Sequence, residues 1–118
     1  LDAIRDELTA MLAALKQAGK TVAGFVAPAK ATTLMYHFGI GPDVIDFIVD
    51  DSPLKQGLYS PGMHIPVLPS AAIYSKKPDA VVILAWNFAE PIIRNHVRYL
   101  KQGGQFIVPL PTVEVVEQ

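Results

Sequence analysis

The sequence predicts an α/β domain in which a mostly parallel sheet carries helices on both of its faces. Apolar runs of strand length alternate along the chain with segments of helical spacing, and two of those runs, 44–49 and 80–85, are nearly continuous in apolar residues. Strands of that kind are typical of sheets that are covered on both sides. With 118 residues, 51% of them hydrophobic, the chain has the size and composition of one globular domain, which we expect to span 1–118.

The first half of the chain contains two predicted helices and two predicted strands. An apolar stripe with intervals of three and four residues predicts the first helix, which Gly19 ends. The stripe consists of Ile4, Leu8, Met11, Leu12 and Leu15. There follow, in order, a strand over 21–26, a turn over 27–30, a helical segment over 33–38 and a strand over 44–49.

The second half repeats this alternation after a long loop, 52–63. The loop is interrupted by proline and glycine and has no regular period, a pattern more often found in functional loops. The elements expected after it are a short strand over 64–68, a short helix through Tyr74, a strand over 80–85, a helix from Pro91 that Gly103-Gly104 ends, a strand over 105–108 and an edge strand over 113–116. Right-handed connections between these elements give a Rossmann-like, three-layer arrangement.

Lys30 lies at the mouth of the helix in the strand, turn and helix segment 21–38. In an open parallel sheet such a turn lies at the carboxyl end of its strand, where the free N–H groups of the next helix bind anions. Lys30 is therefore either a ligand of a phosphate group or a solvated lysine near a helix start. The dinucleotide fingerprint GxGxxG is missing, because Gly24 is the one glycine in this stretch and Pro28 occupies the turn.

Further polar and aromatic residues fall where the expected strands end. Asp50 follows Lys30 by twenty positions, where a carboxylate is able to bond ribose hydroxyl groups, and the alternative is an acidic turn residue. Trp86 directly follows a buried strand and is either a core aromatic residue or part of a pocket wall. Asn87 either caps the next helix or faces the ligand.

The long loop adds residues of types that bind phosphate or stack on a base, namely Lys55, Tyr59 and His64. Each of them alone is more often a surface residue, and their value lies in sharing one loop beside the expected anion site. No serine lies in a nucleophile elbow, and the carboxylates have no local partner for acid–base catalysis. The chain is therefore better explained as a binding domain of a larger enzyme than as an enzyme by itself.

Composition argues against several classes of function. The formal net charge is −1 and no basic run is present, so we do not expect binding of nucleic acid. The chain has no cysteine, and its histidines, His37, His64 and His96, lie far apart, so a metal site is not expected. The apolar runs are far shorter than a membrane-spanning helix and no signal peptide is visible, so we expect a cytoplasmic protein. The start at Leu1 leads us to expect a piece of a longer polypeptide.

Several motifs occur in an order that resembles one known family. They are Ala27-Pro28-Ala29-Lys30, Gly39-Ile40-Gly41-Pro42-Asp43, Ser52-Pro53-Leu54-Lys55-Gln56-Gly57 and Pro61-Gly62-Met63-His64-Ile65-Pro66, then AWNFAEPI from Ala85 and GGQFIVPLP from Gly103. Together they resemble the C-terminal domain of S-adenosylmethionine-dependent C-methyltransferases that act on nucleotide-linked deoxysugars. The resemblance covers nearly the whole chain.

The resemblance implies a Rossmann-like domain that helps to hold a nucleotide-sugar substrate and is not catalytic alone. A separate domain of the same chain would bind S-adenosylmethionine and transfer the methyl group, and a cysteine-ligated zinc module usually precedes both. By motif match the ligand-side residues are Pro28, Ala29, Lys30, Lys55, Tyr59 and His64. Family members commonly have glycine where this chain has Val26 and Ala31, and both changes add side chains near the expected phosphate loop.

Two other functions remain open at this point. The same strand, turn and helix start, together with PDAVVILAWNFAEPI, also suits a module that binds CoA or a dinucleotide. A structural domain that only docks against its neighbour is the other alternative, and such a domain would bind no nucleotide. Competition between pyrimidine diphosphates, CoA and NADH separates the three functions.

Overall fold

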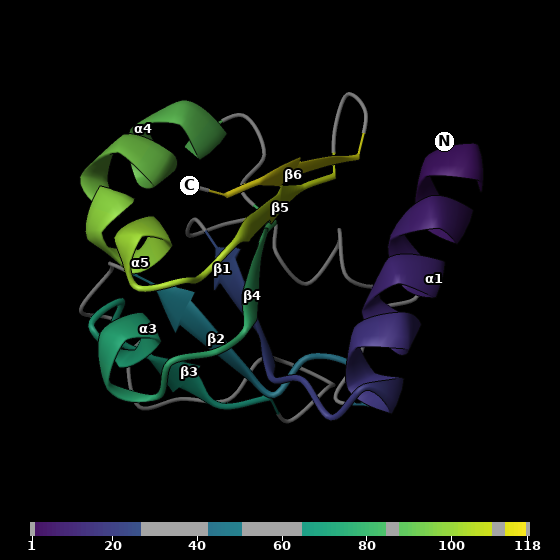
Figure 1. Cartoon of the computed structure of the whole chain (residues 1–118), viewed down its shortest axis with the longest axis horizontal. Coiled ribbons are helices and arrows are strands. Elements are labelled where there is room, and N and C mark those ends of the chain that lie inside the picture. The colour runs from purple at the N-terminus through teal and green to yellow at the C-terminus, as the bar shows by residue number, and fades with distance from the viewer. Residues whose placement is uncertain (1, 27–42, 51–64, 85–87, 110–112, 118) are drawn as a thin grey trace.

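The computed structural model describes residues 2–26, 43–50, 65–84, 88–109 and 113–117 (Figure 1). In chain order the elements within these ranges are α1 (Asp2–Gln17), β1 (Val22–Val26), β2 (Phe47–Asp50), β3 (Val67–Leu68), α3 (Ala72–Ser75), β4 (Ala80–Ile83), α4 (Ala89–Asn95), α5 (Val97–Lys101), β5 (Phe106–Val108) and β6 (Glu114–Val116). The predicted helix over 33–38 and the predicted loop over 52–63 lie outside the described residues. Of the helices in these ranges, none has the length and apolar character needed to cross a membrane.

The strands form one six-stranded sheet in the order β3-β2-β1-β4-β5-β6. β1 to β5 pair in parallel, and β6 joins β5 as an antiparallel edge strand. The strand order reverses between β1 and β4, which are neighbours in the sheet although they are far apart in the sequence. This order is that of a Rossmann-like sheet, so the predicted α/β fold is confirmed.

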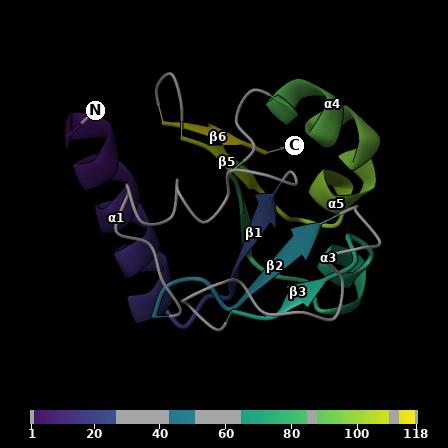
Figure 2. The same ribbon diagram turned by 180° about the vertical axis from the view of Figure 1, so that it is seen from behind.

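Helices lie on both faces of the sheet (Figures 1 and 2). α1 covers one face, where Leu8 and Leu12 are fully buried in a cluster that includes Val82 of β4. α3, α4 and α5 cover the other face, and their apolar side chains join a second cluster that contains Phe25 and Phe106. Because successive side chains of a strand point to opposite faces, an apolar run supplies both clusters at once.

Two carboxylates fasten the amino end of β1 to its neighbours. The carboxylate of Asp46 accepts hydrogen bonds from the backbone N–H of Val22, at 2.9 Å, and from the ammonium group of Lys16, at 2.7 Å. It therefore ties α1 and β1 to the segment that leads into β2. The carboxylate of Asp79 accepts the backbone N–H of Thr21 at 2.8 Å, so the segment before β4 holds the same end of β1 from the other side.

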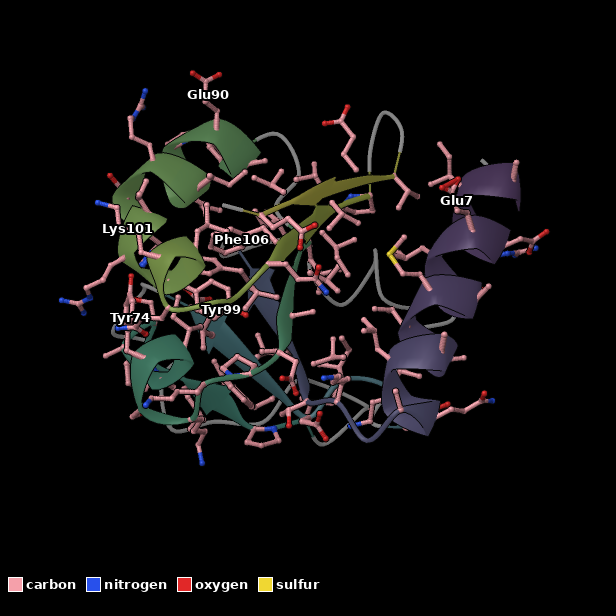
Figure 3. The ribbon with its side chains drawn as sticks, in the orientation of Figure 1. Glu7, Tyr74, Glu90, Tyr99, Lys101 and Phe106 are labelled. Atoms are coloured by element: carbon pink, nitrogen blue, oxygen red, sulfur yellow. The ribbon has the colours of Figure 1, made fainter. Side chains whose placement is uncertain are left out.

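Tyr99 of α5 is buried between its helix and the sheet, beside Phe106 (Figure 3). Its hydroxyl group donates a hydrogen bond of 2.7 Å to the carbonyl of Pro78, and the ring centroids of Tyr99 and Phe106 are 5.2 Å apart. Gly104 lies directly against the Tyr99 ring, so a Cβ atom at that position would overlap the ring. Burial raises the pKa of the Tyr99 hydroxyl well above its usual value, because the charged phenolate loses its hydration there.

Several predicted element boundaries are wrong. The strand expected over 44–49 begins at Phe47, because residues 43 and 44 form a turn. β3 is limited to Val67–Leu68, and β4 ends at Ile83. In contrast, the predicted helix ends are confirmed at Gly19 and Gly103, which follow their helices with φ angles of +79° and +95°, a conformation that favours glycine.

The single helix expected from Pro91 is also wrong, because it begins at Ala89 and is divided into α4 and α5 at His96. The backbone of His96 has φ and ψ angles of −123° and 33°, which are not helical. At this break the hydroxyl group of Tyr74, on α3, lies 2.8 Å from Nδ1 of His96. The break thus coincides with a contact to another element, which helical periodicity does not predict.

Candidate functional site

The carboxyl ends of β1, β2 and β4 meet at one edge of the sheet, where the sequence predicts a ligand. The register pairs Val26 with Asp50 and Phe25 with Ile83, so the three strands end at nearly the same height. The strand order reverses between β1 and β4 at this edge. In open α/β sheets a crevice forms at such a point and receives the ligand. The topology therefore favours the carboxyl edge as the ligand site.

Asp50 is the predicted site residue that falls within the described ranges. It is the last residue of β2 and is 1% exposed, which makes it the one buried charged side chain in the part of the chain that the structure describes. By strand alternation its side chain shares a face with Ile48, which belongs to the cluster beneath α1. A ligand would have to reach this carboxylate from the carboxyl edge, so its bond to a ribose stays a prediction.

The other eight predicted site residues lie outside the described residues, namely Pro28, Ala29, Lys30, Lys55, Tyr59, His64, Trp86 and Asn87. Their places in the chain still relate to the topology. Lys30 follows the last residue of β1 by four positions, and Asn87 follows the last residue of β4 by four positions. Both segments therefore leave the sheet from the two strands between which the order reverses.

Phe88 is a residue at this edge that the sequence analysis did not single out. It occupies the N-cap position of α4, which contradicts the capping role considered for Asn87, and its ring makes no capping hydrogen bond. Phe88 is 51% exposed. The run Trp86-Asn87-Phe88, directly after a buried strand, was the sequence pattern that could have pointed to Phe88 as a site residue. A phenylalanine in such a run is, however, ordinarily expected to be buried.

A cluster of rings supports the carboxyl end of β1 from the side of α3, α4 and α5. The ring of His96 lies 5.3 Å from the ring of Phe25, which precedes the last residue of β1. His96 also contacts Tyr74, as described above, and the guanidinium group of Arg98 lies 4.2 Å from the centre of the Tyr74 ring. Tyr74 thus joins α3 to the break between α4 and α5 and to α5 itself, next to the strand that leads to the predicted phosphate loop.

A separate hollow lies at the opposite, amino edge of the sheet. Its volume is about 510 Å³, and it is lined by Thr21, Asp46, Phe47, Pro66, Leu68 and Lys76. The ammonium group of Lys76 lies 6.0 Å from the centre of the Phe47 ring. Among the described residues that line this hollow, none is predicted to bind a ligand. Within the described ranges, no three acidic or histidine side chains gather closely enough to hold a metal ion.

Two comparisons relate the chain to known proteins. A family model described as the C-methyltransferase C-terminal domain matches residues 1–111. C-methyltransferase NovU of Streptomyces niveus is 38% identical to the chain over 113 residues, which cover 96% of the chain and 27% of NovU. The chain therefore spans about a quarter of the length of this curated relative.

Proposed function

The chain belongs to the C-methyltransferase C-terminal domain family, and we propose that it holds a nucleotide-linked deoxysugar for an S-adenosylmethionine-dependent C-methyltransferase. In this proposal the domain binds the substrate and does not itself transfer the methyl group. S-adenosylmethionine, bound by another domain of the full-length protein, supplies that group. A cysteine-ligated zinc module is also proposed in the full-length protein, outside these 118 residues, which include no cysteine.

The observation that carries the proposal is the reversal of strand order between β1 and β4, with β1 leading directly into Ala27-Pro28-Ala29-Lys30. The reversal supports a ligand site at the carboxyl edge, and the four-residue motif supplies a cation close to the end of β1. A diphosphate carries the complementary negative charge. Charge-assisted hydrogen bonds from a lysine ammonium group are about twice as strong as neutral ones, so Lys30 is proposed as the main diphosphate ligand.

Asp50 and the long loop complete the proposed site. A carboxylate at the end of the second strand of such a sheet is well placed to accept hydrogen bonds from ribose hydroxyl groups, the role proposed for Asp50. Lys55, Tyr59 and His64 are proposed to close over the diphosphate or the sugar from the loop that follows β2. Trp86 and Asn87, which follow β4, are proposed to line the other side of the same crevice.

The experiment that tests the proposal is calorimetric titration of the full-length protein with thymidine diphosphate, uridine diphosphate, CoA and NADH at one salt concentration. Saturable binding of a pyrimidine diphosphate, with no binding of CoA or NADH, is the expected result. Binding of CoA or NADH alone would contradict the proposal in favour of a CoA or dinucleotide module. Failure of all four compounds to bind would contradict it in favour of a structural docking domain.

A further inference from the structure

Phe88 breaks two local rules of protein structure at once. It stands at the N-cap of α4, where serine, threonine, aspartate or asparagine would accept a hydrogen bond from the first turn of the helix. Phe88 is also 51% exposed, although phenylalanine is among the residues most often buried. Functional sites of proteins are places where such local preferences are broken.

The ring of Phe88 is not needed to seat α4 on the sheet. Ala89, Ile92 and Ile93 pack against the cluster that contains Phe25, and these contacts fix the orientation of the helix. Phe88, the N-cap residue, has φ and ψ angles of −111° and 16° and is half exposed, while the helix that follows it is anchored. The exposure of Phe88 therefore does not result from a loosely packed helix.

The position of Phe88 relates it to the proposed ligand site. β4 ends at Ile83 and α4 begins at Ala89, so five residues separate the strand from the helix. The amino end of α4 therefore belongs to the connection that leaves the carboxyl edge from β4, one of the two strands at the reversal of the sheet order. A crevice at this point would have Phe88 on the side of β4 and the carboxyl end of β1 opposite it.

We propose that Phe88 is the stacking surface for the base of the nucleotide in the substrate, an inference that rests on the proposed function. Every nucleobase has an apolar, polarizable face, and stacking on an aromatic side chain removes that face from water. The diphosphate would extend from the base toward the end of β1. Phe88 thus determines how tightly the nucleoside part of the substrate is held, and it contributes nothing to the diphosphate.

The other exposed large apolar residues of the described ranges provide matched controls. Val97, on α5, is 41% exposed, and Val115, on β6, is 44% exposed. Val115 pairs with Ile107 in the middle of the edge strand, and Val97 opens the helix after the break at His96. Neither residue lies between the end of β4 and the start of α4, so replacing either one removes exposed apolar surface without touching the proposed stacking surface.

The test measures the affinity of the full-length protein for thymidine diphosphate and for inorganic pyrophosphate, which lacks the base. Phe88→Leu keeps an apolar side chain but removes the ring, and we expect it to weaken binding of thymidine diphosphate by roughly five- to a hundredfold while leaving pyrophosphate binding unchanged. Phe88→Tyr, which retains the ring, is expected to bind thymidine diphosphate like the wild type. Val97→Ala and Val115→Ala are expected to change neither affinity.

Two results would overturn the stacking role while leaving the proposed function intact. One is an unchanged affinity for thymidine diphosphate in Phe88→Leu. The other is an equal loss of affinity for both compounds, because a parallel loss would mean that the substitution disturbs the site as a whole. A wild-type protein that binds no thymidine diphosphate would instead contradict the proposed function, and the inference would fall with it.

Discussion

The hydroxyl group of Tyr99 donates a hydrogen bond of 2.7 Å to the backbone carbonyl of Pro78, and Tyr99 is only 2% exposed. The bond joins the last helix of the domain to the turn that leads into β4, the central strand at the reversal of the sheet order. The helix layer is therefore tied to the sheet by a buried hydrogen bond as well as by apolar packing.

Replacement of Tyr99 by phenylalanine removes this hydrogen bond and leaves the buried carbonyl of Pro78 without its donor. We expect Tyr99→Phe to lower the free energy of unfolding by about 1–3 kcal/mol, measured by urea denaturation near pH 7. Tyr74→Phe is the matched control, because it also removes one hydroxyl group, but from a partly buried pair with His96. An equal or larger loss in the control would contradict the importance of the buried bond.

The raised pKa of Tyr99 predicts a loss of stability in alkaline solution. In the unfolded chain the hydroxyl group ionises near pH 10, whereas burial keeps it protonated to higher pH in the folded protein. The contribution of the protonated Tyr99 to the free energy of unfolding is therefore fully present below about pH 10. At higher pH the free energy of unfolding falls by about 1.4 kcal/mol for each further pH unit, until the hydroxyl group also ionises in the folded state. Tyr99→Phe lacks this dependence.

The alkaline effect is measured as the difference in unfolding free energy between the wild type and Tyr99→Phe, at about pH 8 and about pH 11. The advantage of the wild type is expected to shrink by about 1.4 kcal/mol between these values, since roughly one pH unit lies above the unfolded pKa. The other tyrosines and the lysines are common to both proteins and cancel in the difference. A difference that stays constant with pH would contradict the assignment.

Gly104 has no room for a side chain, because a Cβ atom there would overlap the ring of Tyr99. We expect Gly104→Ala to destabilise the domain by roughly 1–3 kcal/mol or more, since the ring has to move out of a packed position. Gly24→Ala is the control, because its Cβ would lie 3.1 Å from the flexible end of Leu84 and a small shift relieves it. Thermal denaturation of both variants makes the comparison, and a Gly24→Ala variant that is the less stable of the two would contradict it.

Asp46 makes an ion pair with Lys16 and accepts a hydrogen bond from the backbone N–H of Val22, and two substitutions distinguish the contributions of these contacts. Asp46→Asn removes the charge that faces Lys16 but keeps an oxygen for the N–H of Val22, so we expect a loss of less than about 1 kcal/mol, as for other partly exposed ion pairs. Asp46→Ala removes both contacts, and a loss of about 1–3 kcal/mol is expected. Urea denaturation at low and high salt measures both variants. Equal losses in the two variants would show that the backbone contact contributes nothing.

The parts of the fold with strong periodicity were predictable from the sequence. The stripe of α1 and the apolar run of β4 each match one structural period, and the glycines that end α1 and α5 have the φ angles that their positions require. The start of β2 was not predictable, because Val44 and Ile45 are apolar but belong to the connection before the strand. The break at His96 was hidden as well, because Ile93, Val97 and Leu100 keep a helical spacing across it.

The candidate site was predictable as a place in the sheet but not in its details. Parallel strands end at one edge whatever their side chains, so the position of Asp50 beside the end of β1 followed from the predicted topology. The nearly complete burial of Asp50 did not follow, because it depends on what covers the strand end and not on residue type. The exposure of Phe88 was equally hidden, since the hydrophobicity of phenylalanine predicts the opposite.

The central claim is that a nucleoside diphosphate binds at the carboxyl edge of the sheet, and Lys30→Ala tests it most directly. Lys76→Ala is the matched control, because Lys76 lines the hollow at the amino edge. The measurement is the dissociation constant of thymidine diphosphate by calorimetry in the full-length protein. We predict that Lys30→Ala weakens binding by roughly ten- to a hundredfold, as expected for the loss of a charge-assisted hydrogen bond, and that Lys76→Ala has no effect. Unchanged binding in Lys30→Ala, or a loss in Lys76→Ala alone, would contradict the claim.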